Sequence, residues 1–266
     1  MKRLVLLSVS FFILGLMFVT ISNAAIDLNK AAGIWLFEEK DGAAIVDSSK
    51  NGNSGKAEAT VKHVAGKFGS AISLNGADAW VTVPDKASLD LQGAWTITSW
   101  INVNATEKNW GHIIGKRDPA AAVVNYAFRT DNVGTGWDAY FATGGAWKGI
   151  WNQKSVKPAQ WFYMTATYDG KDVLSIYENG VQIGTLVGMG VPAPANTVDV
   201  IIGGWKDNKT ELLDGMLDEV VLIGDMITTD DMKNLMNNGV AKAFGITAVD
   251  KAGKVATEWG SIKTTR

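Results

Sequence analysis

The chain has 266 residues, of which 47% are hydrophobic and 20% charged, a balance that is typical of a folded globular protein and excludes a disordered one. It contains no cysteine and only two histidines, so disulfides and thiolate metal sites are excluded and a multi-histidine centre is poorly supported. The formal net charge of −2, without a basic stripe, argues against a nucleic acid partner.

The first 24 residues have the features of a targeting segment. Lys2 and Arg3 precede a nearly continuous apolar run over 4–21, and Ser22 and Ala24 are small residues suited to a cleavage site after position 24. The alternative is an uncleaved membrane anchor, because about 18 apolar residues just span a bilayer. The short run and the cleavage site favour a signal peptide, which predicts a secreted, periplasmic or cell-surface protein with no membrane span after cleavage.

Short segments with alternating apolar and polar residues follow one another from about residue 33 to residue 225, which is typical of strands joined by turns. The longest expected strand is 95–103, with Trp95, Ile97 and Ile101 on one face. Asn179-Gly180 between 173–178 and 181–186 predicts a two-residue hairpin. The pattern predicts an all-β fold, a two-sheet antiparallel β-sandwich.

One short helix is expected near the C-terminus. Thr228 is a suitable N-cap, acidic residues follow in the first turn, and Gly239 lies just past the end. Three apolar residues are spaced three and four apart and would pack on the sandwich: Met232, Leu235 and Met236. Residues 245–266 form a basic tail or a closing strand.

Several sequence patches follow one another along the chain in this order: 33–37 (GIWLF), 47–55 (DSSKNGNSG), 66–71 (GKFGSA), 95–101 (WTITSWI), 167–170 (TYDG), 177–180 (YENG) and 215–220 (GMLDEV). In order and spacing they resemble the laminin-G-like, concanavalin A-like lectin/glucanase jelly rolls of exported bacterial proteins. The resemblance implies a single jelly-roll domain over 25–244. It does not specify function, because the same sandwich hosts lectins, adhesion modules, enzymes and structural domains.

The oxygen-rich segment 47–55 suits calcium, which takes six to eight oxygen ligands. The resemblance implies a structural Ca²⁺ that joins this early loop to a late strand. Its ligands would be Asp47, Asn51 and Asn53, with Asp218 as the distant ligand. The alternative is an Asx-rich turn, with Asp218 capping backbone amides.

Glucanase chemistry needs two carboxyl groups about 5–5.5 Å apart in a retaining enzyme. Asp214 and Asp218 share a strand face but lie about 13 Å apart, and Asp218 and Glu219 point to opposite faces. The sequence therefore predicts a non-catalytic protein, with a polysaccharide hydrolase or lyase as the least favoured alternative.

Four tryptophans lie among Gly, Asn, Asp and Lys: Trp110, Trp137, Trp147 and Trp151. Flat aromatic faces beside polar groups are typical of sugar-binding and interface anchors. Arg129 adds a hydrogen-bonding group, and residues 116–118 and the turn at Trp205 are expected near the same face. We therefore expect a module that binds a glycan or an extracellular protein. The alternatives are rings that only cover a sheet edge, and a structural or adhesion domain.

Overall fold

A computed structural model describes residues 26–40, 42, 44–58, 60–104, 110–118, 123–131, 136–154, 156–205 and 211–246. The expected signal peptide (1–24) and the tail beyond residue 246 lie outside these residues, so both remain predictions. Among the described residues, no helix has the length and apolar character needed to cross a bilayer.

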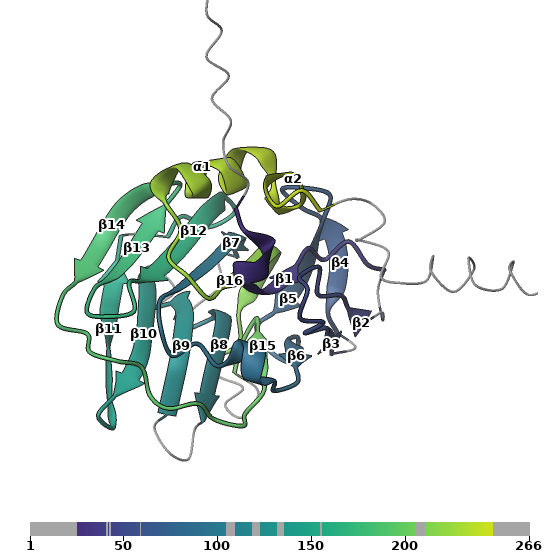
Figure 1. The fold of residues 1–266 in the computed structure, drawn as a ribbon. Coiled ribbons are helices and arrows are strands. Elements are labelled where there is room, and N and C mark those ends of the chain that lie inside the picture. Colours follow the sequence, from purple (N-terminus) through teal and green to yellow (C-terminus); the bar gives the residue numbers. More distant parts are fainter. Residues whose placement is uncertain are drawn as a thin grey trace, which may run out of the picture.

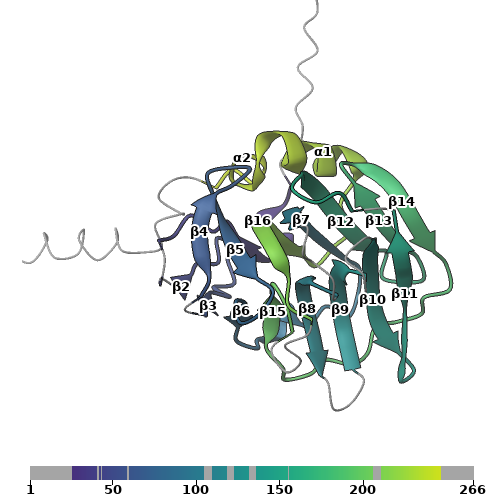
Figure 2. The same ribbon diagram turned by 180° about the vertical axis from the view of Figure 1, so that it is seen from behind.

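Two eight-stranded antiparallel sheets make up the molecule (Figures 1 and 2). In order across the sheet, sheet I contains β14 (Val181–Leu186), β13 (Leu174–Glu178), β12 (Trp161–Tyr168), β7 (Trp95–Val103), β16 (Asp214–Ile223), β5 (Ser70–Asn75) and β4 (Lys62–Ala65), with β1 (Ala31–Trp35) also paired to β16. Sheet II contains β11 (Ala146–Gln153), β10 (Trp137–Thr143), β9 (Val123–Thr130), β8 (His112–Asp118), β15 (Val200–Ile202), β6 (Val81–Val83), β3 (Gly55–Ala57) and β2 (Ala44–Ile45). The predicted two-sheet sandwich is confirmed.

The alternation within β7 shows how the two sheets face each other. Trp95, Ile97 and Ile101 are fully buried in the main core between the sheets. Trp100 belongs instead to a second apolar cluster on the outer face of sheet I. The face expected from the sequence is therefore the core face of this strand.

The predicted hairpin and helix are both present. Glu178 pairs with Val181 across Asn179-Gly180, and these turn residues have φ values of 51° and 77°, as a tight turn of this kind requires. Helix α1 (Thr229–Asn238) begins at Thr228, whose Oγ1 accepts a hydrogen bond from the backbone N–H of Asp231.

The two α-helices pack on sheet I. Met232 and Leu235 of α1, and the unexpected short helix α2 (Val240–Ala243), pack in the second cluster with residues of β1, β7 and β12. In both views α1 and α2 lie together at one end of the sandwich, while β8, β9 and β15 lie at the other (Figures 1 and 2). Two 3₁₀ turns, η1 (Leu28–Lys30) and η2 (Ala87–Leu89), complete the described helical elements.

Candidate functional site

Strand β11 places Trp147 and Trp151 on the outer face of sheet II. Positions 147, 149 and 151 share one face of the strand, while Ile150 points into the core. Both indoles are 41% exposed. Gly149 pairs with Tyr140 of β10, and a Cβ at Gly149 would come within 2.4 Å of the Tyr140 Cβ. The glycine therefore leaves the space in which the Tyr140 ring contacts both indoles, with centroids 5.6 Å and 5.1 Å away.

Two arginines extend this aromatic surface. The guanidinium carbon of Arg117 lies 4.1 Å from the ring centroid of Trp147 and 3.4 Å from that of Trp205. The guanidinium carbon of Arg129 lies 4.7 Å from the Tyr140 centroid. The same carbon lies 5.4 Å from the Trp110 centroid. We call the set the aromatic–arginine row: Trp205, Arg117, Trp147, Tyr140, Trp151, Arg129 and Trp110. Guanidinium–aromatic contacts of this kind contribute about 0.5–2 kcal/mol each, so the row is held in one arrangement.

Paired carboxylates fix the two arginines from the inside. Glu211 Oε2 lies 3.2 Å from Arg117 Nη1 and 3.4 Å from Arg129 Nη1, and Asp138 Oδ2 lies 3.3 Å from Arg129 Nε. None of these four side chains is more than 9% exposed. Removing one partner from such a buried set leaves an uncompensated charge, so the geometry of the row depends on all four residues. Burial raises the pKa of Asp138 against the opposing effects of the Asn152 N–H and Arg129.

His112 is part of the same network. Its Nε2 lies 3.3 Å from the Tyr140 hydroxyl, and its Nδ1 lies 3.4 Å from the Glu211 carbonyl oxygen. Burial, with Arg129 and Arg117, lowers the pKa of His112 well below its ordinary value, and burial raises the pKa of Tyr140. The imidazole is therefore neutral at pH 7. His112 is 2% exposed and Tyr140 is 0% exposed, so both support the exposed rings from beneath.

A cavity of about 260 Å³ adjoins the Trp205 end of the row. Its lining includes Gly115 of β8 and Ile201 of β15, which pair with each other across sheet II. His112, Arg117, Asp199 and Trp205 also line it. The cavity thus combines an aromatic wall with hydrogen-bonding side chains of both signs.

The structure brings together four of the five residues predicted to bind a ligand: Trp110, Arg129, Trp147 and Trp151. Trp137 does not join them, because it is 0% exposed and packs in the core against Phe128 and Phe162. It begins β10, where alternation turns residue 137 inward and Asp138 outward. Arg129 lies in the row but is only 5% exposed, so it supports the rings from beneath.

The predicted calcium ligands lie in two separate places, with Asp47, Asn51 and Asn53 between β2 and β3 and Asp218 in β16. Asp47 Oδ1 accepts from the backbone N–H groups of Ile34 and Ser49, and its Oδ2 accepts from Ser49 Oγ and the Asn53 N–H. The side-chain amides of Asn51 and Asn53 donate to backbone carbonyls of β1. The Asp47 oxygens and the two amide nitrogens are engaged as in the Asx-turn alternative, and this arrangement does not fit a calcium shell. Within the described residues, no group of three acidic, His or Cys side chains could hold a metal ion.

Asp218 and Glu219 serve as structural acceptors. Asp218 Oδ2 accepts from the N–H groups of Lys67 and Phe68, at 2.7 Å and 2.8 Å. A bulge after Asp218 gives Glu219 a φ of 51°, and its Oε1 accepts from the N–H of Val240 in α2. The two carboxylates therefore hold separate segments in place, and neither segment is the one that Asp47 holds.

Sequence reasoning missed Tyr140, Asp138 and Glu211. The Trp-Lys-Gly-Ile-Trp pattern at 147–151 carries a signal for two rings on one strand face with a gap between them. Glu211 has no local signal, because its partner Arg129 lies 82 positions earlier in the chain.

The fold and this face together define the class of protein, which is a jelly-roll β-sandwich with an aromatic surface on one sheet. The family model described as the concanavalin A-like lectin/glucanases superfamily matches residues 75–233, and the chain belongs to this laminin-G-like family. None of the curated protein sequences matches the chain.

Solved structures with the same fold include domain 4 of AbnA, a GH43 extracellular arabinanase from Geobacillus stearothermophilus, in complex with arabinotriose. It is 18% identical, with 77% of this chain and 98% of that chain covered and a TM-score of 0.60. The binding domain of Paraclostridial Mosquitocidal Protein 1 is 16% identical, with coverages of 79% and 52% and a TM-score of 0.64. The binding domain of botulinum neurotoxin DC, in complex with SialylT, is 14% identical, with coverages of 79% and 52% and a TM-score of 0.63. The chain spans about half the length of the two toxin domains, and the likeness shows the fold.

Proposed function

We propose that this protein is an exported, non-catalytic carbohydrate-binding module whose ligand lies on the outer face of sheet II. The observation that carries the proposal is the pair of indoles of Trp147 and Trp151, each 41% exposed on one face of β11. Tyr140 and Arg117 hold these rings in place. Such rings stack on the apolar faces of sugars, while neighbouring polar groups orient the hydroxyls.

Two further observations support a glycan ligand outside the cell. The arabinanase domain, whose length the chain covers almost completely, was solved with arabinotriose. The segment 1–24 has the composition of a secretory signal, which supports a module that works in the periplasm, at the cell surface or in the medium.

The absence of a catalytic role rests on where the titratable groups lie. Asp138 and Glu211 are paired with arginines beneath the rings, and the Tyr140 hydroxyl is covered. A glycosidase needs two carboxyl groups that flank the bond it cleaves. Asp138 and Glu211 support the aromatic surface from beneath and do not form such a pair around a polymer lying on it.

Affinity electrophoresis tests the proposal. The purified protein is run through gels that contain arabinan, xylan, mannan or mixed-linkage glucan, and arabinotriose is titrated by calorimetry. We expect retardation by at least one neutral polymer, and a loss of affinity of about tenfold or more in Trp147→Ala and in Trp151→Ala, because central aromatic anchors dominate binding.

A matched control keeps the test specific. Met226 is 52% exposed and precedes α1, away from the row, so Met226→Ala removes an exposed apolar side chain without touching the face. The melting temperature of each variant is determined on a separate sample, so that a loss of binding can be told from a loss of folding. If no polymer retards the protein, or if both tryptophan variants bind like the control, the proposal is wrong and an extracellular protein ligand or a structural role takes its place.

A further inference from the structure

Two residues that line the cavity beside Trp205 carry buried hydrogen-bond donors that have no acceptor among the described residues. They are Arg117 Nε and Trp205 Nε1, and both atoms are buried. The whole Arg117 side chain is 9% exposed. Buried donors in native proteins are almost always satisfied by protein, water or ligand. The pair therefore points to an acceptor that enters this cavity.

The charges around the cavity decide what kind of acceptor suits it. Arg117 is already paired with Glu211, at 3.2 Å. Asp199 is the carboxylate among the lining residues, and its Oδ1 accepts from the N–H of Asp85 at 3.2 Å. His112, the remaining titratable group in the lining, is neutral. The lining therefore carries one guanidinium and one carboxylate, a combination that suits a hydroxyl group, because a hydroxyl both accepts and donates.

We propose that this cavity binds one uncharged sugar residue of the glycan and selects it by its hydroxyl groups. One or two hydroxyl oxygens accept from Arg117 Nε and Trp205 Nε1, and a hydroxyl donates to Asp199. The proposal rests on the proposed function. It adds that the row supplies stacking on any sugar ring, while Arg117, Trp205 and Asp199 determine which sugar is bound.

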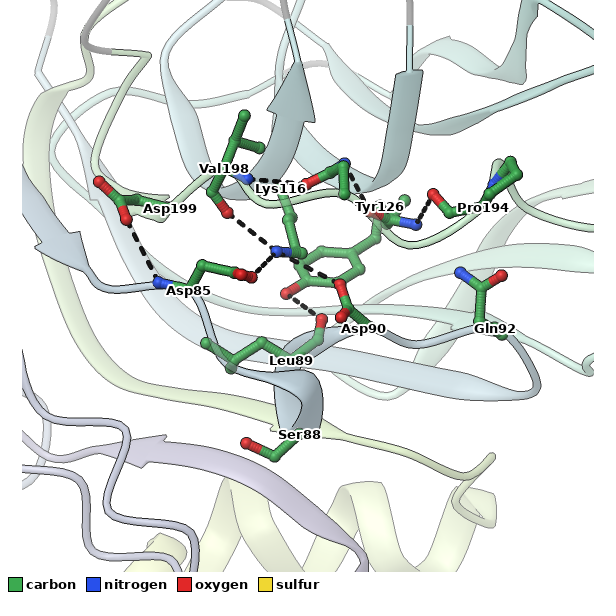
Figure 3. A network of polar contacts seen from close by, with 12 residues as sticks. Asp85, Ser88, Leu89, Asp90, Gln92, Lys116, Tyr126, Pro194, Val198 and Asp199 are labelled. Atoms are coloured by element: carbon green, nitrogen blue, oxygen red, sulfur yellow. Dashed lines mark hydrogen bonds and ion pairs between the residues drawn. The ribbon is translucent and has the colours of Figure 1, made fainter.

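A buried ion network keeps the Asp199 side of the cavity in position (Figure 3). The ammonium group of Lys116, whose side chain is fully buried, donates to the Val198 carbonyl oxygen at 2.8 Å and pairs with the carboxylates of Asp85 and Asp90. Asp85 in turn donates its N–H to Asp199. Lys116 and Arg117 are neighbours in β8, so one strand supplies both the anchor of this wall and a donor in the cavity.

Two substitutions that each change one polar group test the selection. Trp205→Phe keeps an aromatic wall and removes the Nε1 donor. Asp199→Asn keeps an oxygen for the Asp85 N–H and removes the charge. Loss of one hydrogen bond to a bound ligand lowers affinity about fivefold to tenfold, and somewhat more when the partner is charged. We expect these losses for the best neutral polymer found by affinity electrophoresis, measured on variants that still melt cooperatively.

A third variant fills the cavity instead of changing its hydrogen bonds. A Cβ at Gly115 would lie 3.6 Å from the nearest atom, His112 Cδ2, so a side chain fits the backbone there and occupies the cavity. Gly115→Val should therefore fold and should bind the neutral polymer at least about tenfold more weakly. Trp161→Phe, on β12 of the other sheet, is the matched control and should bind like the unmodified protein.

Acidic probes complete the experiment. Polygalacturonate, heparin and sialyllactose should bind at least tenfold more weakly than the best neutral ligand. Tighter binding of an acidic probe would overturn the inference, as would wild-type affinity in Trp205→Phe, Asp199→Asn and Gly115→Val while Trp147→Ala is impaired. That second pattern leaves the proposed function standing, whereas failure of every polymer to bind overturns both.

Discussion

Tyr140 and Gly149 face each other across the β10–β11 ladder, and the glycine has no Cβ where the tyrosine needs space. A methyl group at position 149 would come within 2.4 Å of both the Tyr140 Cβ and the Ala139 carbonyl oxygen. The two exposed tryptophans flank this glycine in the strand. The shape of the aromatic surface therefore depends on one residue that makes no side-chain contact of its own.

Gly149→Ala should lower the free energy of unfolding by about 1–3 kcal/mol, since overpacking forces the strands apart. It should also weaken glycan binding, because the Tyr140 ring and both indoles must shift. Gly93→Ala is the control, since a Cβ there meets nothing within 4 Å, and it should change stability by about 0.5 kcal/mol or less. Urea denaturation of both variants measures the difference, and equal stability would contradict the packing described here.

Substitutions of Trp137 and Trp147 should have different effects on stability and on glycan binding. Trp137→Ala removes a fully buried ring and should cost about 3–5 kcal/mol of unfolding free energy. Trp147→Ala removes a 41% exposed ring and should cost about 1 kcal/mol while lowering glycan affinity. Chemical denaturation gives the first quantity and affinity electrophoresis the second. A stable Trp137→Ala variant that had lost binding would restore Trp137 to the ligand face.

Asp218 predicts a pH dependence of stability. Burial raises its pKa to about 7, although the N–H groups of Phe68 and Lys67 act in the opposite direction. An unfolded aspartate titrates near about 3.9, so between these values the native state holds the extra proton and stability falls as pH rises. Above pH 7 the full cost of ionising this buried carboxyl group, roughly 4 kcal/mol of unfolding free energy, is present. Asp218→Asn keeps an acceptor without a charge, so its stability relative to the unmodified protein should increase from pH 5 to pH 8 in denaturation curves. A constant difference over this range would show that the carboxyl group is not perturbed.

Lys116 should be one of the most sensitive positions outside the core. Lys116→Met leaves the Asp85 and Asp90 carboxylates without their buried cation and should cost about 3–5 kcal/mol. The exposed pair Lys30–Asp225 provides the control, and Lys30→Met should cost about 1 kcal/mol or less. Comparable losses in the two variants, measured by urea denaturation, would refute a buried role for Lys116.

Metal removal should leave the fold unchanged. Both oxygens of Asp47 already accept two hydrogen bonds each, which leaves no position for a calcium ion. The melting temperature should therefore be the same in calcium and in EDTA, while Asp47→Ala should lower it in both buffers. An EDTA-induced fall in the melt would instead support the calcium site expected from the sequence.

Local patterns in the sequence determined the architecture. Alternation over 95–103 assigned a core face to β7, Asn179-Gly180 specified the hairpin, and Thr228 with Gly239 marked the limits of α1. These features depend on the conformation of a few consecutive residues, so a short stretch of sequence is enough to predict them. A short stretch of sequence was also enough to single out Trp110, Trp147 and Trp151, because these residues lie outside the apolar pattern.

Only the tertiary structure decided how the site is built. Trp137 and Trp147 have similar glycine-rich neighbours, yet the register of β10 and β11 sends one ring inward and the other outward. Glu211 reaches Arg117 and Arg129 because the sheet order β9–β8–β15 brings distant segments together. Asp47 and Asp218 are engaged by different backbone turns for the same reason. Side-chain partners across a sheet are set by long-range pairing, and no local propensity of the chain contains that information.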